Sequence, residues 1–177
     1  MTIDYTQPEI KCLIDLIRQD NGNKSLTAAQ VTFGTPSVYT PIPGVTRNTI
    51  IVGQATAISG MEGNQSFYYN RIPLIDFINP LSMSTLFEID GETKLSDLLP
   101  AINARFNINL SASKIYDLSL PSFAGNDTPS VQLKVTPDSM VYLGQITLTI
   151  KATNPDLADY LPVTELQGLT YEPPAQI

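Results

Sequence analysis

Two stretches in the second half of the chain decide the fold: SVQLKVT at residues 130–136 and QITLTIK at residues 145–151. In both, aliphatic residues alternate with polar ones, a period of two that is typical of β-strands with one buried face. Residues 48–58 and 63–72 in the first half also read as strands, and a glycine joins them. We therefore expect an antiparallel strand pair in each half of the chain.

A helix is expected before the first strand pair. Leu13, Ile14 and Ile17 recur at helical spacing and define one apolar face. Pro8 suits the first turn of a helix, where its missing N–H costs nothing, and Gly22 suits the left-handed position after the last turn. The first helix should therefore lie between Pro8 and Gly22.

The second half should also contain a helix, over residues 98–106, with Ser96 as a plausible cap. Pro100 removes a backbone donor, so this helix is expected to begin later than its cap suggests. Residues 86–94 read as a β-hairpin, because the Asp-Gly pair at 90–91 is a strong hairpin-turn signal.

The two halves resemble each other. LIDLI at 13–17 corresponds to LLPAI at 98–102, and LTAAQV at 26–31 corresponds to LSASKI at 110–115. The period is about 81 to 85 residues, too long for a solenoid repeat, so we interpret it as a duplicated small module.

The expected fold class is therefore α+β and β-rich, with two related modules at residues 1–75 and 76–152. Each module is expected to be a helix packed on a small antiparallel sheet. An irregular, Pro-rich arm at 153–177 follows. The arm carries the apolar anchors Tyr160, Leu161, Leu166, Leu169 and Tyr171. So many apolar residues should not remain in water, and we expect the arm to pack on its own body or on a neighbour.

Composition removes several classes of function. Seventeen acidic and ten basic residues give a net charge of −7, which argues against a nucleic-acid-binding surface. The chain has no histidine, the commonest general base and metal ligand, and so no Ser-His pair. A single cysteine excludes an internal disulfide framework and a Cys-rich metal site. We expect no cofactor, and a weakly charged surface that lies against other proteins.

No targeting signal or membrane segment is expected. The first seven residues lack the basic and apolar regions of a signal peptide. No apolar run approaches the roughly 20 residues that a membrane helix needs. The sequence thus predicts a soluble protein made in a reducing cytoplasm, where its cysteine stays a thiol.

One motif has the spacing of a catalytic pair. Ser111 and Lys114 match the S-x-x-K arrangement of serine nucleophile and lysine in penicillin-recognising enzymes. However, Thr27 and Gln30 occupy the equivalent positions of the first half, and they are not a nucleophile and its base. The shared feature is a helix cap, which we favour.

Two other features have simple structural interpretations. Glu88, Asp90 and Glu92 form the densest acidic cluster, but the expected turn separates them, so a solvated turn is favoured over a metal site. Cys12 lies beside the apolar face of the first helix, where a small buried hydrophobe is a commoner role than a reactive thiol.

The best contact candidates are Tyr39, Tyr68, Tyr69 and Arg71, because Tyr and Arg are enriched at interface hot spots. On an alternating strand, one of Tyr68 and Tyr69 must face away from the core. The alternative is an ordinary strand pair without a partner. Arg47 and Arg71 stand out among so few basic residues; each either pairs with an acid or fixes a loop.

These patterns together resemble a module found in virion structural proteins of large tailed bacteriophages. The residues that carry the resemblance are 16–36, 47–49, 67–71, 98–103 and 109–112, and it covers most of residues 7–152. It implies a non-enzymatic component of a phage particle, in the tail, baseplate, neck or capsid decoration. Its partners would be other virion proteins and copies of itself, with no nucleic acid and no membrane.

Two other functions stay open. A receptor- or carbohydrate-binding module of a tail or fibre would use exposed tyrosines such as Tyr39, Tyr68 and Tyr69 beside Asp and Asn loops. A carboxylate-only glycosidase would need two acids about 5 to 9 Å apart in a cleft. No acidic pair in the sequence stands out for that role, so the virion component is our main hypothesis, with the protein made in the host cytoplasm and located in the virion.

Overall fold

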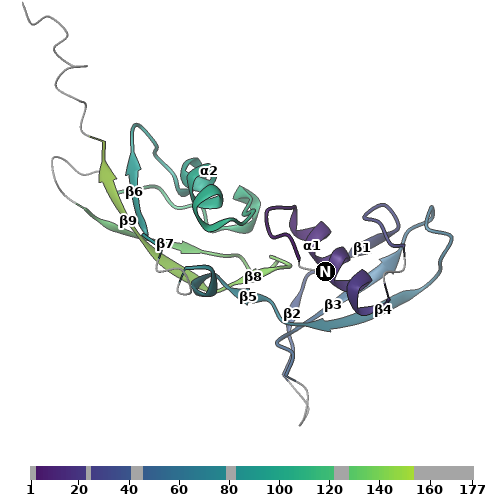
Figure 1. The fold of residues 1–177 in the computed structure, drawn as a ribbon. Helices are drawn as coiled ribbons and strands as arrows, with labels where there is room; N and C mark the ends of the chain where they lie inside the picture. The colour runs from purple at the N-terminus through teal and green to yellow at the C-terminus, as the bar shows by residue number, and fades with distance from the viewer. Residues whose placement is uncertain (1–2, 23–24, 41–45, 79–82, 122–127, 154–177) are drawn as a thin grey trace, which may run out of the picture.

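A computed structural model gives an α+β, β-rich fold, as the sequence predicts (Figure 1). The residues that it describes are 3–22, 25–40, 46–78, 83–121 and 128–153. Within them lie the helices α1 (Glu9–Asp20) and α2 (Leu95–Phe106). Figure 1 shows α1 beside the strands of the first half and α2 beside those of the second half. Each helix therefore packs with the sheet formed mainly by its own half.

The first sheet is built around β3. Its strands are β1 (Val31–Phe33), β2 (Ser37–Val38), β3 (Thr49–Ala55) and β4 (Asn64–Tyr69). β4 pairs with one side of β3, while β1 and β2 pair with the other side, all antiparallel. α1 covers one face of this sheet, where Leu13 clusters with Ile51 and Tyr69. The predicted first strand pair is confirmed as β3 and β4.

Beyond the first sheet, the described residues form a three-stranded sheet and a two-stranded one. The strands are β5 (Ile72–Pro73), β6 (Leu86–Ile89), β7 (Ser130–Lys134), β8 (Tyr142–Leu143) and β9 (Gln145–Ala152). β7 runs antiparallel to β9, which confirms the second predicted pair. β6 runs parallel to the other side of β9, and β5 pairs in parallel with β8. Short 3₁₀ helices, η1 (Leu74–Phe77) and η3 (Ala112–Lys114), lie in the connections.

α1 has the boundaries that the sequence predicts. Pro8 precedes its first residue, and Gly22 follows its end with φ +69°. Two neighbouring side chains of the helix enter different clusters: Cys12 joins the large one around α2, and Leu13 joins the small one on β3 and β4. Cys12 is 3% exposed, so its prediction as a buried hydrophobe is confirmed. α1 thus links the two halves.

The expected hairpin over residues 86–94 is wrong. β6 pairs with β9, not with the residues after the turn, and the chain passes through Gly91 (φ +93°) directly toward α2. The reason lies in the helix cap. The carboxylate of Asp97 accepts hydrogen bonds from the N–H groups of Thr93 (3.0 Å) and Lys94 (2.9 Å), so these donors are not available to a second strand.

The predicted start of the second helix is also wrong, because α2 begins at Leu95 despite Pro100. Its first donors are satisfied from outside the helix. The N–H of Leu95 donates to the carbonyl oxygen of Leu118 (3.0 Å), and the N–H of Ser96 donates to the carboxylate of Asp117 (2.8 Å). These bonds hold the first turn, so the single donor lost at Pro100 does not prevent it.

The predicted duplication stays a prediction. Both halves have a helix followed by an antiparallel strand pair. In both, a short segment after the helix pairs near the end of the first strand of that pair. Val31 pairs with Ala55, the last residue of β3, and Ile115 pairs with Val135, the residue after β7. The surrounding strands differ, since β6 lies parallel to β9 and no described strand lies in that way beside β4.

Candidate interaction site

The face of the first sheet that points away from α1 carries no charge. We call this the outer face. Register and alternation assign to it Thr32, Ser37, Ile50, Val52, Gln54, Asn64, Ser66 and Tyr68. Two of its larger side chains are well exposed, Val52 at 43% and Tyr68 at 49%. A neutral surface of this kind loses little hydration energy when another protein covers it.

An aromatic pair extends the outer face at one end. The rings of Tyr39 and Tyr68 lie 4.9 Å apart at 62°, in an edge-to-face arrangement. Tyr39 is held there by its backbone N–H, which donates to the carbonyl oxygen of Asn48 (3.0 Å). Two of the sequence-predicted contact residues thus lie together on one surface.

The outer edge of β4 pairs with no strand in the described part of the chain. The N–H of Ala55 donates to the carbonyl oxygen of Gly63 (3.0 Å), so the odd-numbered residues of β4 direct their backbone groups toward β3. The backbone groups of Asn64, Ser66 and Tyr68 therefore point to the open edge. No charged residue or proline protects β4, although natural edge strands usually carry such protection.

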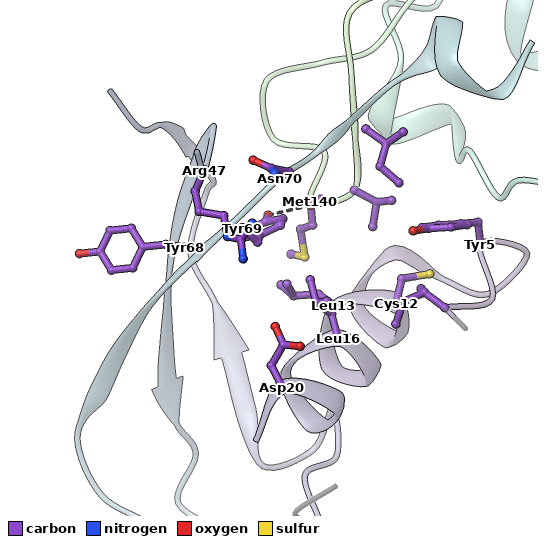
Figure 2. A pocket seen from close by; sticks show the side chains of 13 residues that line it. Tyr5, Cys12, Leu13, Leu16, Asp20, Arg47, Tyr68, Tyr69, Asn70 and Met140 are labelled. Carbon is purple, nitrogen blue, oxygen red and sulfur yellow. Dashed lines mark hydrogen bonds between the residues drawn. The ribbon is translucent and has the colours of Figure 1, made fainter. Parts of the chain in front are cut away.

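A cavity of about 350 Å³ opens beneath the other face, between α1 and the end of β4 (Figure 2). Leu13, Leu16 and Met140 line its apolar part, and Asp20 and Arg47 lie among its polar lining. Figure 2 shows Tyr69 directed toward Met140 and Tyr68 pointing away from α1. This space fits an apolar group that carries a polar or charged end.

Alternation at the end of β4 is confirmed. Tyr69 is only 7% exposed, and its hydroxyl donates to the carbonyl oxygen of Met140 (2.7 Å). Burial raises the pKa of Tyr69, which therefore remains a neutral donor. Of the two neighbours, Tyr68 alone presents its ring to solvent.

Arg71 fixes a loop, which decides between the two roles that the sequence left open. The side chain is 8% exposed. Its Nη1 donates to the carbonyl oxygens of Pro137 (2.9 Å) and Ser139 (3.0 Å), and its Nε donates to the hydroxyl of Thr49 (3.1 Å). Arg71 thus joins the end of the first sheet to the loop between β7 and β8.

Glu9 holds the same loop from α1. Its carboxylate accepts hydrogen bonds from the hydroxyl of Ser139 (2.9 Å) and the N–H of Met140 (2.5 Å). Burial is the main influence on this carboxyl group and raises its pKa. Sequence reasoning missed Glu9 and Ser139, because an acid in a first helical turn is ordinary and nothing local indicates that it is buried.

Lys114 binds the loop from a third side. Its Nζ lies 2.7 Å from a carboxylate oxygen of Asp138 and donates to the carbonyl oxygen of that residue (3.1 Å). The bond from Lys114 lowers the pKa of Asp138. Ser111 instead contacts Ser113, with 3.1 Å between the hydroxyl oxygens. The S-x-x-K motif therefore places its lysine on a loop acid.

The remaining candidates lie apart from these residues. Glu88 is exposed on β6, and Asp90 donates its N–H to Glu92 (2.5 Å) in the turn that follows. Within the described residues, no group of three His, Cys, Asp or Glu side chains could hold a metal ion. Tyr160, Leu161, Leu166, Leu169 and Tyr171 lie outside the described residues.

Comparison with known proteins gives a family. In the described ranges, neither helix is long and apolar enough to cross a bilayer. No curated protein and no solved structure is significantly similar to the chain. A model of a family of unknown function, DUF7941, matches residues 3–176, nearly the whole sequence. The chain therefore belongs to the DUF7941 family.

Proposed function

We propose that this chain is a non-enzymatic structural protein that acts through protein–protein contacts. The observation that carries the proposal is the charge-free outer face with the open edge of β4 beside it. Protein interfaces are depleted in charge at their centre and enriched in tyrosine. In a chain of net charge −7, such a face also lets copies or partners approach with the least repulsion.

The loop contacts support the same role. Arg71, Glu9 and Tyr69 hold the loop at residues 137–140 against the base of the first sheet. A surface on a rigid support loses little conformational entropy when it binds. A preorganised face suits a protein whose task is to occupy a fixed position among neighbours.

We propose a phage virion as the assembly, in the tail, baseplate, neck or capsid decoration. Support comes from the sequence resemblance to virion structural proteins. The partners would be other virion proteins and copies of this chain. Production in the host cytoplasm and a location in the particle follow from that proposal.

The test is incorporation of tagged variants into particles, measured by gradient sedimentation followed by immunoblotting. Tyr68→Glu adds a charge to the outer face and should greatly reduce incorporation. Tyr116→Glu is the matched control, since Tyr116 has a similar exposure (43% against 49%) but lies in the second half. Equal incorporation of Tyr68→Glu and wild type would contradict the proposal.

The cavity favours a second candidate, a carbohydrate-binding module. Asp20, Arg47 and Asn70 are among its lining residues, and carboxylate, guanidinium and amide groups are suited to hydrogen bonds with sugar hydroxyls. A glycan array tests this function directly. Binding that Asp20→Asn abolishes would favour it, and an array without any bound glycan would count against it.

A further inference from the structure

We propose that β4 pairs with β4 of a second copy of this chain, antiparallel, about a two-fold axis at Ser66. This inference rests on the proposed function and names one partner of the open edge. The pairing would join two first sheets into one continuous sheet. Antiparallel addition to an open edge is a common way for proteins to bind through their backbones.

The free backbone groups determine the register. Asn64, Ser66 and Tyr68 direct their N–H and C=O groups away from β3. In a two-fold antiparallel pair, Ser66 meets Ser66 of the second copy, and Asn64 meets its Tyr68. All three residues then find partners, and about six hydrogen bonds form. Every other register between these residues leaves some of them unpaired.

The same register also matches the faces of the two sheets. Asn64, Ser66 and Tyr68 lie on the outer face, and Gln65 and Phe67 lie on the face toward α1. Because directly opposed residues share a face, the proposed register places outer residues opposite outer residues. A shift by one residue would place Phe67 opposite an outer position. The edge is thus self-complementary, as a two-fold interface requires.

The edge satisfies one acceptor by itself. The side-chain amide of Gln65 donates to the carbonyl oxygen of Ser66 (3.1 Å). An N–H of the second copy would replace this exposed bond, so pairing leaves no acceptor at the centre without a donor.

Charge favours a second copy as the occupant. β4 itself is uncharged, so two copies place no like charges opposite each other along the strands. In the same register, Glu62 of one copy lies opposite Asn70 of the other copy. The N–H of Asn48 donates to Asn70 (2.9 Å), which places the adjacent Arg47 at that end. Arg47 forms no ion pair within the part of the chain that the structure describes.

A single cysteine tests the register. In a hydrogen-bonded antiparallel pair the opposed Cα atoms lie about 5.5 Å apart, which is within the roughly 4.4–6.8 Å range of disulfides. Ser66→Cys, made with Cys12→Ser so that it is the only thiol, should give a covalent dimer on mild oxidation. Thr32→Cys in the same background is the control, because Thr32 is exposed on the outer face but lies on β1. It should form no disulfide-linked dimer under the same oxidation.

The full-length wild-type chain provides a second readout. Its mass by analytical ultracentrifugation should rise with concentration from monomer to dimer. Ser66→Lys places two like charges on the two-fold axis and should weaken dimerisation at least about tenfold, whereas Thr32→Lys, with the same charge change, should not. Circular dichroism checks that each variant is folded.

Each outcome decides the inference. A disulfide-linked dimer of the Ser66→Cys variant, together with weakened dimerisation of Ser66→Lys, supports it. A wild-type chain that stays monomeric, or a dimer that Ser66→Lys leaves intact, overturns it. A photo-crosslink from position 66 to residues 154–177 also overturns it, because the C-terminal segment would then occupy the edge. If the dimer is overturned in one of these ways, the proposed function is still tested independently, by the incorporation of Tyr68→Glu into particles.

Discussion

The contact of Arg71 with the loop at residues 137–140 gives the sharpest stability prediction. Arg71→Met keeps most of the apolar volume of the side chain and removes its donors. The carbonyl oxygens of Pro137 and Ser139 then lose their hydrogen bonds, and the hydroxyl of Thr49 loses a third. The loop loses its link to the first sheet on that side.

The size of the effect follows from burial. An unsatisfied buried polar group costs about 1–3 kcal/mol, so two orphaned carbonyl oxygens cost about 2–6 kcal/mol. Arg71 is only 8% exposed, and its removal also relieves the cost of burying a guanidinium group. We therefore expect Arg71→Met to lower the free energy of unfolding by about 2–4 kcal/mol.

Urea titration followed by circular dichroism measures this change, since the chain has no tryptophan. Arg47→Met is the matched control, because Arg47 is exposed, and substitutions of that kind usually change stability by about 0.5 kcal/mol or less. If Arg71→Met changed the free energy of unfolding no more than Arg47→Met, the assignment of Arg71 as the support of the loop would be refuted.

Three further predictions concern other buried positions. A Cβ at Gly53 would lie 2.9 Å from a ring carbon of Phe67, so Gly53→Ala should lower the free energy of unfolding by about 1–3 kcal/mol, as urea titration can measure. Gly34→Ala is the control and should have a smaller effect, because the atom nearest to its Cβ would be 3.8 Å away. Burial raises the pKa of Glu9, so the folded state binds the proton of this carboxyl group more tightly than the unfolded state does. The free energy of unfolding of the wild type should therefore fall relative to that of Glu9→Gln as pH rises above 4.5, and a difference that does not depend on pH would contradict this. Burial also raises the pKa of Cys12 to about 11, so a thiol reagent at about pH 8 should label the chain in urea but not the folded chain, as mass spectrometry can measure.

Local patterns predicted the strands well. Val131 and Leu133 alternate with polar residues, and both are buried in the structure, because period-two burial is a property of the strand itself. The same argument required one of Tyr68 and Tyr69 to face away from the core, and the structure shows that it is Tyr68. α1 was equally predictable, since its proline and glycine signals act within one turn of its ends.

The errors arose where partners from distant parts of the chain decide the structure. The Asp-Gly pair at 90–91 is a turn signal, but it does not reveal whether a strand or a helix follows. α2 begins early because Asp117 and Leu118 supply acceptors from beyond the helix.

The candidate site also contains some residues that the sequence could predict and others that it could not. Tyr39 and Tyr68 could be selected from residue type and alternation alone. The buried loop contacts could not, since Arg71 and Pro137 are 66 residues apart and Glu9 and Ser139 are 130 residues apart. No local pattern in the sequence links residues so far apart.

The position of Glu9 has a consequence for synthesis of the chain. The residue emerges from the ribosome 130 residues before Ser139, the side chain that donates to its carboxylate. Until then, packing α1 fully on the growing chain would bury a carboxylate without donors, which is unfavourable. We therefore expect the N-terminal half to complete its folding late, after the loop at residues 137–140 has been translated. A nascent chain stopped near residue 120 should remain sensitive to protease within α1.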